Sequence, residues 1–126
     1  MTRGPLEGRR ILLVEDEYFQ AIDAKRWLEE AGAEVVGPAG NSEAIGGCIA
    51  AADFDAAIVD INLGGGPDFG VADELRRRAV PMLFLTGYDR AQIPPEHAEV
   101  PCLNKPANAG DVIRTVERLL GTPRVR

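Results

Sequence analysis

Short apolar runs alternate along the whole chain with segments of helical periodicity. The clearest runs cover residues 11–14, 56–59 and 82–85, and they are rich in branched and aromatic side chains. Because they show no polar alternation, they are typical of strands that are buried on both faces of a sheet. Weaker runs at 34–36 and 102–103 complete the set. The order predicts an α/β domain of (βα)5 type, with a five-stranded parallel sheet and helices on both faces.

Helices are expected between these strands, beginning with a clear apolar stripe over residues 17–31. The residues predicted to cap or end the helices are Gly32 after the first, Asn41 or Ser42 before the second, Asp68 before a third that runs to residue 78, and Asn108 with Asp111 before the last. An irregular fourth helix is expected between residues 88 and 100, because Pro94 and Pro95 interrupt it.

A length of 126 residues leaves room for one domain. We expect an N-terminal extension over residues 1–9, the domain over 10–121 and a tail over 122–126. The composition, 45% hydrophobic and 27% charged, is that of an ordinary soluble globule. The formal net charge of −6 argues against nucleic acid as a partner, because a binder of phosphates needs basic surface.

No apolar run approaches the roughly 20 residues that a membrane span requires, so no membrane association is expected. The two cysteines, Cys48 and Cys102, are too few for a disulfide scaffold, which favours a cytoplasmic location. We expect both of them to pack as small apolar side chains, and we expect His97, which follows two prolines, to lie in an exposed loop.

Polar side chains follow four of the predicted strands at the point where each strand ends. They are Glu15 and Asp16 after the first strand, Asp60 after the third, Thr86 after the fourth and Lys105 after the fifth. Ligands of open parallel sheets bind at this edge. Clustered carboxylates repel one another unless a cation joins them, and an all-oxygen set favours Mg²⁺. Together with a lysine and a hydroxyl, the set describes a phosphoryl-transfer site with an aspartate nucleophile.

The residues at these strand ends form recognisable motifs: Leu13-Val14-Glu15-Asp16-Glu17, Val59-Asp60-Ile61-Asn62-Leu63, Phe84-Leu85-Thr86-Gly87-Tyr88 and Asn104-Lys105-Pro106. In this order and placement the chain resembles the receiver domain of two-component response regulators, from residue 10 to about residue 121. The resemblance implies a doubly wound, flavodoxin-like fold.

The resemblance also implies a role for each residue. Asp60 would be the phosphoacceptor, and Thr86 and Lys105 would bind the phosphoryl oxygens. Asp16, Asp60 and the backbone carbonyl of Asn62 would bind Mg²⁺, with Glu15 acting through a water molecule. The phosphoryl group would come from a sensor histidine kinase or a phosphotransfer protein, so the chain is expected to be a phosphoacceptor signalling protein and not an enzyme.

The chain departs from the common family pattern at the expected conformational switch and in the loop after Asp60. The family usually carries Tyr or Phe three residues before its lysine, and here that position is Cys102. The stretch 84–88 instead resembles stand-alone receivers with a Phe-Ala-Thr-Gly-Tyr-type motif, which makes Tyr88 the candidate substitute. The glycines at 64–66 predict a mobile loop after Asp60.

The leading hypothesis is a single-domain response regulator, a monomer or weak dimer. It would signal through phosphorylation-dependent contact with an unknown downstream protein, or act as a phosphate sink. One alternative is an interaction module that keeps the fold without phosphorylation. A second is a Mg²⁺ phosphatase of the haloacid-dehalogenase type, whose Asp-x-Asp motif is lacking in the stretch 60–62.

Overall fold

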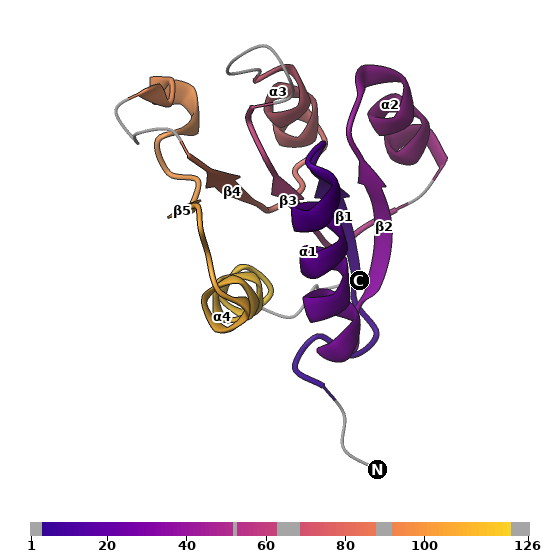
Figure 1. The fold of residues 1–126 in the computed structure, drawn as a ribbon. Coiled ribbons are helices and arrows are strands. Elements are labelled where there is room, and N and C mark those ends of the chain that lie inside the picture. Colours follow the sequence, from indigo (N-terminus) through magenta and orange to yellow (C-terminus); the bar gives the residue numbers. More distant parts are fainter. Residues whose placement is uncertain (1–3, 52, 63–68, 88–91, 122–126) are drawn as a thin grey trace.

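The computed structural model describes residues 4–51, 53–62, 69–87 and 92–121, and it is built on one parallel sheet (Figure 1). The strands are β1 (Arg10–Val14), β2 (Glu34–Ala39), β3 (Ala56–Val59), β4 (Met82–Thr86) and β5 (Cys102–Asn104). Their order in the sheet is β2-β1-β3-β4-β5, and every neighbouring pair is parallel. The strand order reverses beside β1, and this is where such sheets place their ligand sites.

In the described part of the chain, three α-helices and one short 3-10 turn lie between the strands, and a fourth α-helix follows the last strand. They are α1 (Tyr18–Glu30), α2 (Ser42–Ala51), α3 (Gly70–Arg77), α4 (Ala109–Leu119) and the 3-10 turn η2 (Pro95–His97). Helices α1 and α4 cover one face of the sheet, and α2 and α3 cover the other (Figure 1). The doubly wound arrangement is therefore confirmed, as is the irregular element in place of a fourth helix. None of the described helices is long and apolar enough to cross a membrane.

Each central strand contributes side chains to two separate cores. In β1, Ile11 and Leu13 face α1 and α4, whereas Leu12 and Val14 face α2 and α3. All four are at most 1% exposed. Burial on both faces explains why the sequence shows an unbroken apolar run there and no alternation. Cys48 and Cys102 are half-buried and pack against the core on the α2 and α3 side, as expected.

The predicted helix caps are mostly confirmed. The side chain of Asn41 accepts a hydrogen bond from the Ala44 N–H at 2.9 Å, and that of Asn108 accepts one from the Asp111 N–H at 2.8 Å. Gly32, with φ of +99°, follows the end of α1. Helix α3 runs from Gly70 to Arg77, close to the predicted end at residue 78, and Asp68, the predicted cap, lies outside the described residues.

The prediction that His97 lies in an exposed loop is wrong. Its side chain is 1% exposed, because η2 turns the imidazole inward against the rings of Phe69 and Phe84. A polar residue that follows two prolines is usually exposed, and only tertiary packing, which local sequence does not report, reverses that tendency here.

Residues 4–9, expected to form an extension, pack against the domain. Leu6 is 1% exposed in the core beneath α1, and its N–H donates to the Ala31 carbonyl at 2.8 Å. A side chain at Gly4 would lie only 2.1 Å from the same carbonyl oxygen, so this close approach requires glycine.

We predict that Leu6→Ala lowers the free energy of unfolding by about 2 to 4 kcal/mol, because it leaves a cavity under the end of α1. The control Ile22→Ala removes a side chain that is 43% exposed, so it should cost about 0.5 kcal/mol or less. Urea unfolding followed by circular dichroism measures both. Equal, small effects would show that residues 4–9 are an appendage.

Candidate functional site

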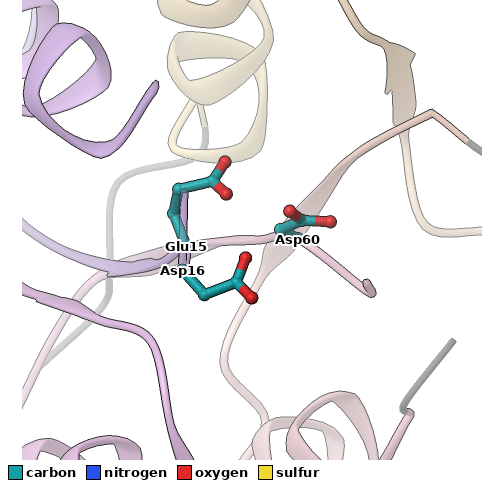
Figure 2. A group of neighbouring side chains, drawn as sticks. All are labelled: Glu15, Asp16 and Asp60. Carbon is teal, nitrogen blue, oxygen red and sulfur yellow. The ribbon is translucent and has the colours of Figure 1, made fainter. Parts of the chain in front are cut away.

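Three carboxylates gather where β1 and β3 end (Figure 2). Oxygen atoms of Glu15, Asp16 and Asp60 all lie within 4.8 Å of one another. Glu15 and Asp60 are each 4% exposed, whereas Asp16 is exposed to solvent. The main chain holds this arrangement, because the Asp60 N–H donates to the Val14 carbonyl at 2.9 Å and so extends the pairing of the two strands.

The end of β2 passes close beside this cluster. The Glu15 N–H donates to the Ala39 carbonyl at 3.0 Å. A side chain at Gly40 would lie 2.9 Å from the Cα atom of Asp16, so only glycine permits this approach. The main chain of β2 and β3, on either side of β1, thus fixes the backbone positions of Glu15 and Asp16.

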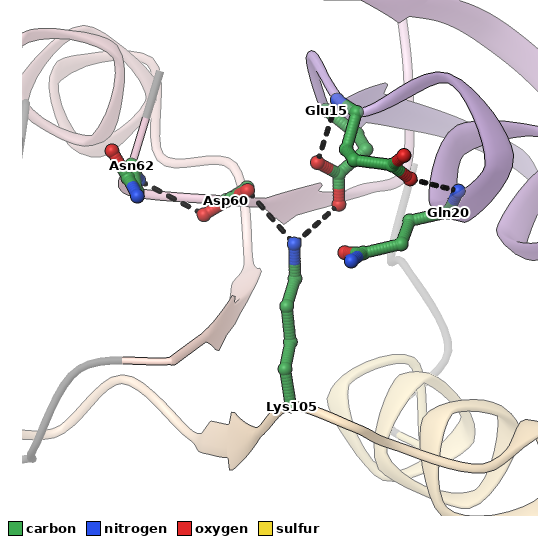
Figure 3. Close-up of polar contacts among 6 residues, drawn as sticks. Glu15, Gln20, Asp60, Asn62 and Lys105 are labelled. Atoms are coloured by element: carbon green, nitrogen blue, oxygen red, sulfur yellow. Dashed lines mark hydrogen bonds and ion pairs between the residues drawn. The ribbon is translucent and has the colours of Figure 1, made fainter. Parts of the chain in front are cut away.

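Lys105, which directly follows β5, places its ammonium group between the two buried carboxylates (Figure 3). Its Nζ atom lies 2.8 Å from Glu15 Oε1 and 2.9 Å from Asp60 Oδ2. The Lys105 N–H donates to the Thr86 carbonyl at 2.8 Å, which anchors the start of this side chain to the end of β4. One cation therefore joins residues from three different strand ends.

The titration behaviour of this group follows from burial and from the paired charges. Burial raises the pKa of Glu15, and the neighbouring Asp60 raises it further, against the opposing effect of the Lys105 ammonium. Burial alone would lower the pKa of Lys105, but its hydrogen bonds to both carboxylates outweigh this effect and raise the pKa above its ordinary value. The lysine is therefore held in its charged form.

Backbone N–H groups orient the remaining carboxylate oxygens. The Asn62 N–H donates to Asp60 Oδ1 at 2.9 Å, and the Glu17 N–H donates to Glu15 Oε2 at 3.1 Å. The two oxygens of Asp60 thus have different partners, a backbone amide and an ammonium group. This fixes the plane of the carboxylate at the mouth of a cavity of about 340 Å³.

The described residues that line this cavity are Asp16, Glu17, Gln20, Asp60, Asn62, Gly87 and Lys105. The sequence predicts no role in the site for Glu17, Gln20 or Gly87, although Glu17 and Gly87 belong to the strand-end motifs. Their positions in the sequence could have indicated that they line the site. Each lies within a few residues of a predicted site residue, and the first helix starts directly after the acidic pair. Helix α1 therefore forms one wall of the cavity.

The oxygen atoms of this cavity suit a small hard cation. Asp16 and Asp60 offer carboxylate oxygens, and no histidine or cysteine belongs to the described cluster, which fits Mg²⁺ better than a softer metal. Glu15 belongs to the same cluster, but its carboxylate also accepts hydrogen bonds from Lys105 and Glu17. Asp16 and Asp60 could therefore hold such a cation directly, with Glu15 behind them.

The remaining predicted residues have different outcomes. Thr86 lies at the end of β4, where its side chain is fully buried and opposite Asn104 of β5 in the sheet register. Tyr88 and the glycines at 64–66 lie outside the described residues. The structure therefore brings Glu15, Asp16, Asp60 and Lys105 together and sets Thr86 on the neighbouring strand.

Comparisons with known proteins agree with this geometry. The family model for the response regulator receiver domain matches residues 11–117. A response regulator receiver protein from Sinorhizobium medicae is 26% identical, with 94% of this chain and 99% of that chain covered at a TM-score of 0.78. SdrG from Sphingomonas melonis is 30% identical, with coverage of 95% and 99% and a TM-score of 0.76. TrrA from Thermotoga maritima, solved in complex with Mg²⁺-BeF, is 28% identical, with coverage of 89% and 99% and a TM-score of 0.76. Comparison with curated protein sequences found no significant match.

We predict that Mg²⁺ stabilises the folded chain, because it offsets the repulsion among the three carboxylates. At a hundredfold excess over its dissociation constant, the gain is about 2.7 kcal/mol. Thermal unfolding with and without Mg²⁺ measures it. Asp16→Asn should lose most of the gain, whereas the control Asp23→Asn, on the exposed surface of α1, should keep it. Equal stabilisation of both variants would place the cation elsewhere.

Proposed function

The chain belongs to the response regulator receiver domains, and on that premise we propose that Asp60 accepts a phosphoryl group in the presence of Mg²⁺. The donor is the phosphohistidine of a sensor histidine kinase or a phosphotransfer protein. The observation that carries the proposal is the pairing of a buried aspartate with a lysine across the sheet, at 2.9 Å, beside a second buried acid.

The transfer exchanges one bond for another. A carboxylate oxygen of Asp60 forms a bond to phosphorus, while the bond between phosphorus and the donor histidine breaks and its electron pair returns to the imidazole nitrogen. Asp16, Asp60 and the Asn62 carbonyl, with Glu15 acting through water, would hold Mg²⁺, which would supply neutralisation of charge on the phosphoryl oxygens. Before the reaction Asp60 is held in place by Asn62 and Lys105.

After the transfer, the charges around Lys105 have changed. Asp60 no longer carries a carboxylate charge, because its oxygen is now bonded to a dianionic phosphoryl group. The ammonium of Lys105 then binds a phosphoryl oxygen, and the hydroxyl of Thr86 binds another. Because Lys105 and Thr86 are joined by a backbone hydrogen bond, their movement affects the ends of β4 and β5 together. The relative TrrA was solved in complex with Mg²⁺-BeF, which supports the proposal that Mg²⁺ takes part.

The surface around the cavity indicates where the donor lies. Asp60 is nearly buried, and α1 forms one wall of its cavity, so a donor protein that reaches it through this cavity comes close to α1. Tyr18 is 68% exposed, Phe19 71% and Ile22 43%, all on this helix. The rings of Tyr18 and Phe19 contact each other at 5.2 Å, and contiguous exposed apolar surface of this kind marks interaction sites. We assign them to the docking of the donor.

The phosphorylated form acts through contact with a downstream protein, or the chain serves as a phosphate sink for its kinase. The chemistry consumes one phosphoryl group for each modification, and only self-phosphorylation and hydrolysis of the aspartyl phosphate are expected. The chain is accordingly a signalling phosphoacceptor.

We predict a single phosphoryl adduct when the protein is incubated with acetyl phosphate and Mg²⁺, detected by intact mass spectrometry. Asp60→Asn and removal of Mg²⁺ should each abolish the adduct, because they remove the nucleophile and the charge neutralisation. The control Asp23→Asn should be modified like the native chain. If Asp60→Asn is still modified, the assignment of the phosphoacceptor is wrong.

We predict that Phe19→Ala slows phosphotransfer from the fastest donor in a panel of autophosphorylated histidine kinases by about tenfold or more, since it removes apolar contact area. Labelling by acetyl phosphate, which needs no docking, should be unchanged. The matched control Glu29→Ala, at the far end of α1, should leave both rates alone. Equal slowing with both donors would place Phe19 in the chemistry and not in docking.

A further inference from the structure

The buried ring of His97 belongs to a cluster of three aromatic side chains. Its centroid lies 5.9 Å from that of Phe69, with nearly parallel planes at 16°, and 5.8 Å from that of Phe84, edge to face at 79°. Phe69 and Phe84 also contact each other, at 6.1 Å and 70°. These separations fall in the favourable range for both geometries. The cluster joins three segments that are far apart in the sequence.

The two ring nitrogens of His97 differ in their hydrogen bonding. Nε2 lies 2.8 Å from Asp73 Oδ1 on α3. Because a carboxylate only accepts, Nε2 carries the hydrogen. Nδ1 is buried and has no hydrogen-bond partner among the described residues. A buried polar atom without a partner costs free energy, so a purely apolar ring would fill this space at lower cost. The imidazole is therefore not explained by packing alone.

The segment that carries His97 is also tied to α3 by a second contact. The guanidinium of Arg76 donates to the backbone carbonyl of Glu96, the residue next to His97. Asp73 and Arg76 lie one turn apart on α3, so both contacts connect the same face of this helix to η2. The Asp73 side chain is 54% exposed, and the polar connection therefore ends at the surface.

The other end of the cluster reaches the phosphoacceptor site. Phe84 lies in β4 two residues before Thr86, and in the register it pairs with Cys102 of β5. No residue of β5 carries an aromatic ring. Phe69 directly precedes α3 and follows the segment that begins at Asp60. A displacement of β4 at Thr86 would consequently reach His97 through the ring contact between Phe84 and His97.

We propose that His97 is a positioning residue that couples β4 to α3 through the contacts Phe84–His97–Asp73. Occupation of the site on Asp60 draws Thr86 toward the phosphoryl group, shifts β4 and moves the His97 ring, and the hydrogen bond to Asp73 passes this movement to the surface of α3. This inference rests on the proposed function, which supplies the displacement of Thr86.

Close packing makes such coupling effective. Aromatic rings in contact cannot move independently, because protein interiors resist compression. The hydrogen bond adds direction, since Nε2 and Asp73 must stay aligned within a narrow range of distance and angle. Removal of the hydrogen bond alone should therefore interrupt the coupling and leave the aromatic packing in place.

The test uses the full chain labelled with ¹⁵N and titrated with beryllofluoride and Mg²⁺, with amide chemical shifts as the measurement. Shifts at Asp16 and Asp60 report that the site is loaded, and shifts over residues 73–77 report the response of α3. We expect both sets to change in the native chain. In Asp73→Ala and in His97→Phe, the α3 response should fall by about fivefold or more while loading persists.

Two further variants separate coupling from a general loss of structure. Asp73→Asn keeps an oxygen acceptor for Nε2–H and should retain the response of α3. Glu74→Ala, the matched control on the same helix, removes the ion pairs with Arg77 and Arg78 but leaves His97 untouched, and it should respond like the native chain. Rescue by Asp73→Asn would not follow from a merely structural role.

The outcomes distinguish the inference from the function on which it rests. A full α3 response in both Asp73→Ala and His97→Phe, or none in the native chain although the site is loaded, overturns the coupling and leaves the phosphoacceptor intact. If beryllofluoride fails to change the shifts of Asp16 and Asp60 in the native chain, the proposed function fails, and the coupling fails with it.

Discussion

The candidate site at the ends of the strands depends on one interaction, the contact of the Lys105 ammonium group with the carboxylates of Glu15 and Asp60. Two carboxylates that are each 4% exposed would repel one another and favour protonation if no cation lay between them. The lysine contacts both within 2.9 Å, and its pKa is raised in consequence. The orientation of the Asp60 carboxylate is thus fixed by Lys105 on one oxygen and by the Asn62 N–H on the other.

The fold provides this contact because three strands end at the same level of one sheet. Burial of β1 and β3 on both faces fixes their register, and the hydrogen bond from Lys105 N–H to the Thr86 carbonyl fixes the end of β5 relative to β4. A shift of one strand by one residue would turn its side chain away from the others. The two hydrophobic cores therefore stabilise the arrangement of charges as well as the sheet. Asp16, the exposed member of the three-carboxylate cluster, follows the buried Glu15 at the end of β1.

Much of this could be predicted from the sequence, because the relevant signals are local. Unbroken apolar runs identify the strands, and the polar residue after each run identifies the site, so Glu15, Asp16, Asp60 and Lys105 were found together. Gln20 and Gly87 were missed, because lining a cavity depends on the direction of neighbouring elements. The burial of His97 and the packing of Leu6 depend on contacts between distant segments, which no local pattern contains. Tyr88 stays a prediction as a switch residue.

The most direct test of the central claim is to locate the phosphoryl group chemically. The protein is phosphorylated with acetyl phosphate and Mg²⁺ and reduced with borohydride, which converts an aspartyl phosphate to homoserine, and the product is mapped by peptide mass spectrometry. The account predicts homoserine at position 60 and nowhere else. Conversion at Asp16 or at another acid, with Asp60 intact, would contradict it.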